Sequence, residues 1–238
     1  MNSCGVPQSA EESAVSRTVA GSTPAPAAVQ TWADRAAAIS RNKRPKFTIE
    51  RDSIAAFYEV HQEYALHTLP TYKAPRVLDL GANAGVFSWM VFQHWPDATV
   101  TAYEPHPDTY RALLGNTDGM AVEVICAAVT REAGTVKLYE GRRNRLCCST
   151  LDLGDQDVEC SWEVAAVAAV TLPPCDVLKV DTEGAEVDIL ETYQHLATVK
   201  CVLVECHSAE LHQKVVAILS CNGLTALDQR SNTVRFVR

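Results

Sequence analysis

The residues best suited to chemistry lie in one short acidic stretch, KVDTEGAEVDILE, at residues 179–191. The stretch begins inside an apolar strand, DVLKV, and then carries five carboxylates: Asp181, Glu183, Glu186, Asp188 and Glu191. Because clustered carboxylates repel one another and are costly to bury, they either form a solvated helix face or include working residues. Negative charge at a helix N-terminus accounts for Glu186, and a solvated helix side accounts for Asp188 and Glu191. Asp181 ends an apolar strand, so neither explanation covers it.

A second pair of ionisable residues, Glu205 and His207, follows the next apolar strand in CVLVECH. The carboxyl ends of neighbouring parallel strands open into the same crevice, so we expect this pair to face Asp181 and Glu183. Histidine titrates near neutral pH, and crowding raises the proton affinity of carboxylates. We therefore predict Asp181, Glu183, Glu205 and His207 as the catalytic residues. The same donors could hold a magnesium ion, but the residues do not require one, and no metal site is predicted.

A glycine-containing turn in VLDLGANAGVFS marks a second candidate part of the functional site. Gly81 and Gly85 let the backbone approach a ligand closely, and the helix behind them offers free N–H groups. The dinucleotide fingerprint GxGxxG is absent, since Ala82 and Asn83 follow Gly81, and pyrophosphate binding is therefore the weaker interpretation. Asp79 has the wrong charge for a phosphate and the right charge for an ammonium or sulfonium group.

Another carboxylate, Glu104, ends the following strand in TAYEPHP. It comes after Gly81 by roughly the 20 residues at which an acidic side chain can accept both hydroxyls of a ribose. A ligand with a ribose and a positive charge suggests S-adenosylmethionine, which we predict as the cofactor. His106, after a proline, is expected to be a solvated loop residue.

The elements that must position these residues form an alternating pattern from Arg76 onward, which is typical of βαβ units and a parallel sheet. Strands are expected at 76–80, 98–104, 121–129, 135–140, 162–172, 176–181 and 200–206. Helices are expected at 84–94, 107–114, 184–194 and 208–221. A loop at 141–157, which carries the arginine-rich GRRNR, interrupts the alternation, and two strands around residues 230–232 are expected to close the sheet as an antiparallel hairpin.

The first 70 residues differ in composition from the rest of the chain. Residues 1–30 are rich in Ala, Ser, Thr and Pro, so we predict a disordered tail. Residues 31–70 are predicted to form N-terminal helices: a short helix at 31–40 and an amphipathic helix that ends before Pro70. Residues 71–238 are predicted to form one catalytic domain.

Composition limits the class of partner. The 21 Lys and Arg against 29 Asp and Glu give a net charge of -8, which disfavours nucleic acid and anionic membranes as partners. The chain has no long apolar run and no signal-peptide core, and its nine scattered cysteines suggest free thiols, so a soluble cytoplasmic protein is expected. We expect a small-molecule partner, and a homo-oligomer is compatible with this composition.

Four blocks in this order resemble the FkbM family of S-adenosylmethionine-dependent methyltransferases: VLDLGANAGVFS, AYEPHPDTYRALLGN, CAAVTREAGTVKLYEG and DVLKVDTEGAEVDILE. The resemblance covers roughly residues 76–207 and implies an α/β fold of the Rossmann-like class I methyltransferase type, with a doubly wound, mostly parallel sheet. It also implies a set of cofactor-binding residues: Asp79, Gly81, Ala82, Asn83, Gly85, Glu104, Pro105, Cys126 and Ala127. The family often has Asn where this chain has Cys126, so backbone contacts are the ones expected there.

The expected activity is methyl transfer from S-adenosylmethionine to a hydroxyl of a sugar or secondary metabolite, because the family typically methylates such oxygens. Three alternatives stay open on the sequence: methylation of a small-molecule amine, a non-catalytic module that binds the cofactor, and an NAD-dependent dehydrogenase.

Overall fold

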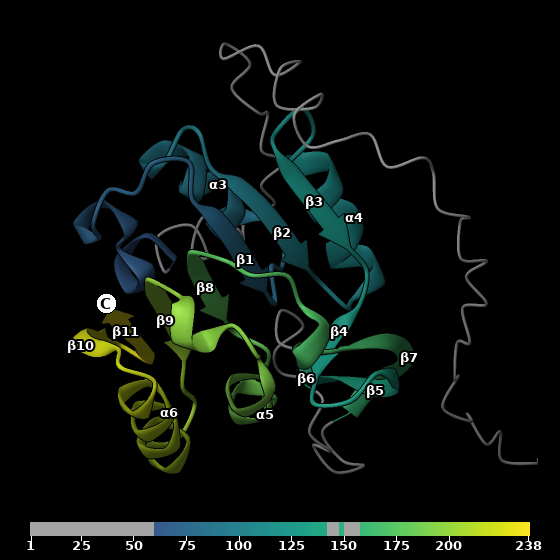
Figure 1. Ribbon diagram of the computed structural model, residues 1–238. Helices are drawn as coiled ribbons and strands as arrows, with labels where there is room; N and C mark the ends of the chain where they lie inside the picture. Colours follow the sequence, from purple (N-terminus) through teal and green to yellow (C-terminus); the bar gives the residue numbers. More distant parts are fainter. Residues whose placement is uncertain (1–59, 142–147, 150–157) are drawn as a thin grey trace, which may run out of the picture.

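The computed structural model describes residues 60–141, 148–149 and 158–238, and the expected tail at 1–30, the helix at 31–40 and most of the GRRNR loop lie outside these ranges. The main feature is a seven-stranded sheet in the order β10-β11-β9-β8-β1-β2-β3 (Figure 1). Its strands are β1 (Arg76–Leu80), β2 (Thr99–Tyr103), β3 (Val122–Ile125), β8 (Val177–Val180), β9 (Cys201–Glu205), β10 (Thr225–Arg230) and β11 (Thr233–Val237).

Strand direction divides this sheet into two parts. The five strands β3, β2, β1, β8 and β9 pair in parallel, whereas β11 is antiparallel to both β9 and β10. The last two strands therefore form the expected antiparallel hairpin, with the second of them inserted next to β9. Parallel order on both sides of β1 confirms the doubly wound, Rossmann-like sheet.

A second, four-stranded sheet has the order β4-β7-β5-β6 and lies beside α5 (Figure 1). Its strands are β4 (Ala128–Thr130), β5 (Gly134–Gly141), β6 (Cys148–Ser149) and β7 (Val158–Ala168). The single strand expected at 121–129 is wrong, because the chain leaves the main sheet after Ile125 and resumes as β4 in the second sheet. The strand expected at 162–172 ends at Ala168 and continues as a short 3-10 helix, η2 (Ala169–Thr171).

Helices cover both faces of the main sheet. They are α3 (Val86–His94), α4 (Pro107–Asn116), α5 (Glu186–Thr192) and α6 (Ala209–Cys221), close to the ranges expected, with two 3-10 turns at η1 (Leu66–Thr68) and η3 (Leu196–Thr198). Within the described ranges, no helix combines the length and apolar character needed to cross a membrane.

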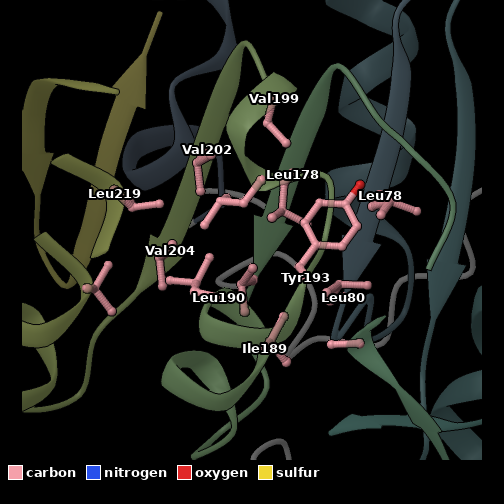
Figure 2. Close-up of a cluster of buried hydrophobic side chains, with 14 of the residues drawn as sticks. Leu78, Leu80, Leu178, Ile189, Leu190, Tyr193, Val199, Val202, Val204 and Leu219 are labelled. Atoms are coloured by element: carbon pink, nitrogen blue, oxygen red, sulfur yellow. The ribbon is translucent and has the colours of Figure 1, made fainter. Parts of the chain in front are cut away.

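The two faces of the central strands have different chemistry. Even-numbered residues such as Leu78, Leu178 and Val202 pack under α5 and α6, and Figure 2 shows Ile189 and Leu190 directed toward them. Odd-numbered residues face α3 and α4, where Val77, Val177 and Leu203 continue the apolar packing. On that second face, buried charged residues appear toward the carboxyl ends of the same strands.

The segment before the sheet is described from residue 60 onward. Its helical residues end at Tyr64, Ala65 takes a left-handed conformation with φ of 39°, and η1 follows. The helix therefore ends before Pro70, as predicted, and it stops at Tyr64 because a left-handed residue breaks the i to i−4 hydrogen-bond ladder. Tyr64 and Leu66 nevertheless pack into the core on the α3 face.

Candidate active site

The centre of the site is a buried lysine between β1 and β8. Lys179 is paired in register with Asp79, and its side chain is 4% exposed. The Lys179 Nζ lies 2.6 Å from the Gly81 carbonyl oxygen, 3.2 Å from Asp181 Oδ2 and 3.4 Å from Asp79 Oδ1. Because a buried charge is costly unless it is paired, these contacts explain how an ammonium group is held inside an apolar sheet. The neighbouring carboxylates raise the pKa of Lys179 against the opposing effect of its burial, so it stays charged.

The Asp79 carboxylate is wholly buried against this lysine. Its Oδ2 accepts a hydrogen bond of 2.6 Å from the Ser88 hydroxyl of α3, and its Oδ1 faces Lys179. Burial raises the pKa of Asp79, while Lys179 and Ser88 act in the opposite direction. The positive charge next to Asp79 in the structure is therefore that of Lys179, and contact with a sulfonium stays a prediction.

The glycine turn is shaped by close packing inside the protein. Gly81 has φ of +75°, and a Cβ added there would lie 1.7 Å from the Asp181 carbonyl oxygen. Gly85 has φ of +88°, and its added Cβ would lie 2.7 Å from Leu113 Cδ1 of α4. Both glycines are thus required by the backbone path itself. The N–H groups of Gly81 and Ala82 donate to the Tyr103 carbonyl, which ties the turn to β2.

Glu104 connects the glycine turn to the start of α4. Its two carboxylate oxygens accept backbone N–H bonds, each of 2.8 Å, from Asn83 and His106. Burial is the largest influence and raises the pKa of Glu104 to about 7. The expectation that His106 is a solvated loop residue is wrong: it is buried as the N-cap of α4, where Nδ1 accepts from the N–H groups of Asp108 and Thr109.

The predicted transfer residues meet at the carboxyl ends of β8 and β9. Ligand atoms of Asp181, Glu205 and His207 all lie within 4.8 Å of one another. His207 Nε2 is 3.2 Å from Glu183 Oε2, and His207 Nδ1 is 3.9 Å from Glu205 Oε1. The structure thus brings all four predicted catalytic residues into one cluster, although they come from the ends of two different strands.

Protonation within this cluster is uneven. Burial, followed by the adjacent Asp181 charge, raises the pKa of Glu205 to about 9. Glu205 is therefore protonated at neutral pH and can share its proton with Asp181 through their side-chain hydrogen bond. A carboxyl group with a raised pKa beside a second carboxyl group is an arrangement able to donate and to accept a proton.

The remaining acids of the stretch have structural roles. Glu186 is wholly buried at the start of α5 and accepts hydrogen bonds from the Thr182 N–H, the Thr182 hydroxyl and the Gly184 N–H. It therefore fixes the turn that carries Asp181 and Glu183. Farther along α5, Asp188 and Glu191 are about half exposed and pair with Arg131, as expected for a solvated helix side.

Sequence reasoning missed Lys179 and Tyr64. Tyr64 is buried and donates its O–H to Asp181 Oδ2 at 3.2 Å. A lysine inside the apolar run DVLKV was a signal for the first of these residues, because an unpaired charge there would be too costly. Tyr64 gave no comparable signal, since a tyrosine on the apolar face of an amphipathic helix usually only packs in the hydrophobic core. Of the other predicted cofactor residues, Ala127 is buried, while the Cys126 side chain is exposed with Sγ 3.9 Å from the Pro105 carbonyl.

Comparison with known proteins shows which protein family the chain belongs to. The family model described as the methyltransferase FkbM domain matches residues 79–227. The chain belongs to the FkbM methyltransferase family. This FkbM protein is therefore an S-adenosylmethionine-dependent methyltransferase, and family membership disfavours the dehydrogenase and the non-catalytic module.

Two similar proteins illustrate the relationship. Methyltransferase sdnD of Sordaria araneosa is 26% identical over 209 residues, which span 71% of this chain and 80% of that protein. The crystal structure of methyltransferase FkbM from Methylobacillus flagellatus KT has a TM-score of 0.53 and 11% identity, covering 87% of this chain and 58% of that chain. The second likeness shows a shared Rossmann-like fold.

Proposed function

We propose that this FkbM protein transfers a methyl group from S-adenosylmethionine to a hydroxyl of a small molecule, in the class of sugars or secondary metabolites. The observation that carries the proposal is the convergence of Asp181, Glu205 and His207 within 4.8 Å, next to the glycine turn. A hydroxyl acceptor must lose its proton during or after attack, and a positioned base contributes about 10²–10⁴-fold. The cluster supplies groups that can take this proton.

The cofactor end is proposed at the carboxyl ends of β1 and β2, where ligands bind in open α/β sheets. S-adenosylmethionine supplies an electrophilic methyl group on a sulfonium. Glu104 is a buried carboxylate beside the turn, and each of its oxygens keeps a lone pair beyond the one used by a backbone N–H, so the donor set fits ribose hydroxyls. The proposed contacts are Asp79, Gly81, Ala82, Asn83, Gly85, Glu104, Pro105, Cys126 and Ala127.

At the transfer end, Asp181 is proposed to accept the hydroxyl proton while the new O–CH₃ bond forms. The electron pair of the breaking S–CH₃ bond returns to sulfur, so charge and atoms balance. Asp181 is held by Lys179 and Tyr64, which orient it for the acceptor. His207, placed between Glu183 and Glu205, offers a path by which the proton leaves the crevice.

Magnesium chemistry at the same place is not part of this proposal. Asp181, Glu205 and His207 have the donor types and spacing that could hold a divalent ion. However, Lys179 lies 3.2 Å from Asp181 Oδ2 and already supplies a positive charge there. The acid and base groups of the chain are sufficient for the transfer described.

Methylation of an amine is the second candidate, because the crevice is rich in carboxylates that attract a cationic acceptor. Asp181, Glu183 and Glu205 lie at the transfer end with Lys179 as a buried counter-charge. An amine must arrive neutral to attack, so its methylation rate rises with pH up to the pKa of the amine. A hydroxyl acceptor instead depends on the base of the protein.

Mass spectrometry of small-molecule extracts incubated with methyl-labelled S-adenosylmethionine tests the proposal. A product heavier by one labelled methyl on oxygen is the expected result. The Asp181→Asn variant should bind S-adenosylhomocysteine normally and lose about 10²–10⁴-fold in rate. Asp188→Asn, a change of the same type on the exposed side of α5, is the matched control and should keep the wild-type rate. A label found only on nitrogen, or an unchanged rate in Asp181→Asn, would contradict the hydroxyl mechanism.

A further inference from the structure

The segment that precedes the matched family domain lies against the transfer end of the site. The family match begins at residue 79, whereas the helical residues ending at Tyr64 and the 3-10 turn η1 come before it. Tyr64 and Leu66 are both buried on the α3 face of the sheet. The Tyr64 ring packs edge-on against Phe87, with ring centroids 5.2 Å apart. This segment is therefore part of the folded unit, although the family model does not include it.

A buried arginine from the end of the chain holds this segment in place. Arg235 of β11 is 1% exposed, and its Nη1 lies 3.1 Å from the Tyr64 carbonyl oxygen and 3.2 Å from that of Ala65. The same nitrogen donates to the Thr68 hydroxyl at 2.8 Å, while Asp228 of β10 pairs with the guanidinium. The Ala65 carbonyl also accepts from the Thr68 N–H of η1, and Arg235 adds donors to it and to the Tyr64 carbonyl. The backbone around Tyr64 is thus held by hydrogen bonds from Arg235, whose guanidinium is paired with Asp228 of the hairpin.

The Tyr64 hydroxyl reaches the proposed base. It donates to Asp181 Oδ2 at 3.2 Å, and burial together with the nearby carboxylates raises the pKa of Tyr64 well above its usual range. The phenol consequently stays protonated and remains a donor over the whole working range of pH. Lys179 Nζ lies 3.2 Å from the same oxygen. A carboxylate held by two donors on one oxygen has a fixed plane, so the position of Oδ1 is fixed as well.

We infer that Tyr64 is a positioning residue for methyl transfer, supplied by a segment outside the matched domain and acting through Asp181. The inference rests on the proposed role of Asp181 in taking the acceptor proton. Tyr64 and Lys179 hold Oδ2, Glu205 bonds the same carboxyl group from the end of β9, and Oδ1 is the oxygen proposed to face the acceptor hydroxyl. Arg235 holds Tyr64 through its backbone carbonyl. The β10–β11 hairpin, the segment around Tyr64 and Asp181 are therefore joined by one chain of contacts, which we call the connected unit.

The Tyr64→Phe variant tests this role, because it removes one hydroxyl and keeps the ring that packs on Phe87. Tyr72→Phe is the matched control, since Tyr72 also packs on an aromatic side chain and its hydroxyl faces the Lys200 carbonyl at 3.5 Å, away from the cluster. The kcat for methyl transfer should be about 10- to 100-fold lower in Tyr64→Phe than in wild type, since misplacing a reacting group slows a reaction by factors of this size. The KM for S-adenosylmethionine and the Kd for S-adenosylhomocysteine should stay at wild-type values, and the Tm should fall by no more than a few degrees, because one hydrogen bond is lost while the ring packing is kept.

Two outcomes would overturn the inference, and they differ from failure of the proposed function. An unchanged kcat in Tyr64→Phe, with an active wild type and a slow Asp181→Asn, would remove the positioning role and leave the base intact. If no extract accepts label from the wild type, the proposed function fails, and a crystal structure of Tyr64→Phe still tests the inference. We expect the Asp181 carboxylate to rotate away from its wild-type plane, and an unmoved carboxylate would overturn the role of Tyr64.

A second variant tests the connection through the hairpin. Arg235→Lys keeps the charge and removes the forked donors that bind Asp228 and the segment carbonyls. Hydrogen exchange of residues 60–69 should speed up at least about tenfold, as expected for a segment that opens locally, and kcat should fall as in Tyr64→Phe. In the double variant with Tyr64→Phe, kcat should fall little further, because both changes act on the same oxygen of Asp181. Additive losses in kcat would contradict the connected unit.

Discussion

The two faces of the strands β1, β8 and β9 bury different kinds of side chain, apolar on one face and partly charged on the other. Under α5 and α6 the face is apolar throughout, with residues such as Leu80, Leu178 and Val204. Under α3, one residue further along each strand, the sheet buries Asp79 and Lys179. The first face stabilises the fold by removing apolar surface from water. The second places charge where the strands end, at the cost of desolvating each charged group.

This difference predicts that the charged face tolerates less change than the apolar face. An apolar core can relax partly around a missing methyl group, and the loss is graded. The charged face cannot relax in that way, because removing one partner leaves the other buried without compensation. Activity and stability should therefore respond separately on the apolar face and together on the charged face.

The largest effect is expected where the charged face meets the backbone. Gly81→Ala would place a Cβ 1.7 Å from the Asp181 carbonyl oxygen, so one of the two strand ends must move. Urea unfolding should show a loss of more than about 4 kcal/mol or no folded protein at all. Gly119→Ala is the control, since Gly119 has the same φ of +75° and nothing within 4 Å of an added Cβ. It should cost only about 1 kcal/mol, and equal losses in the two variants would show that close packing at Gly81 is unimportant.

A smaller but still large effect is expected at the buried charge. Lys179→Met should lower the free energy of unfolding by about 3–5 kcal/mol, because Asp79 and Asp181 lose their counter-charge. Adding Asp79→Asn should restore part of this loss, which chemical denaturation of the single and double variants will measure. Leu178→Ala, one residue away on the apolar face, should cost about 2–5 kcal/mol and leave kcat per folded molecule unchanged. The comparison between the faces breaks down if Leu178→Ala lowers kcat as Lys179→Met does.

The third effect concerns the pH dependence of stability and is absent at acidic pH. The pKa of Glu205 is about 9 in the folded protein against a usual value of 4.5, so between these values the folded state holds a proton that the unfolded chain has released. Its contribution is fully present below pH 4.5 and is lost as the pH rises through about 9. Glu205→Gln should therefore gain stability relative to wild type as the pH rises from 5 to 9, in urea unfolding at several pH values.

Glu191→Gln, an exposed carboxylate on α5, is the control and should show no such trend. A constant difference in unfolding free energy between Glu205→Gln and wild type would show that Glu205 is ionised at neutral pH.

The sequence predicted the sheet well because period and turn signals are local. The apolar runs at 76–80, 176–181 and 200–206 became β1, β8 and β9, and the polar turn near Ser231 became the hairpin. The strand expected at 121–129 failed because nothing in AVEVICAAV signals a change of sheet after Ile125. Hydrophobic periodicity predicts which residues form a strand, but it does not predict which sheet that strand joins.

The site was predicted as a set of residues and not as a network. Strand ends place Asp181 and Glu205 at one edge, so their meeting follows from topology alone. The pairing of Asp79 with Lys179 depends on strand register, which no local signal fixes. The contact between Tyr64 and Asp181 joins segments far apart in sequence. His106 looked solvated although the start of α4 at Pro107 was predicted, because histidine is not among the residues that usually cap helix N-termini.

The place of Arg235 near the end of the chain bears on how the protein is made. β11 is the final strand, and its arginine fastens a segment that leaves the ribosome long before it. During synthesis, Tyr64 and the glycine turn emerge while the residue that secures them has not yet been translated. The contacts that hold the proposed base can therefore form only after β11 has been translated, well after Asp181 itself.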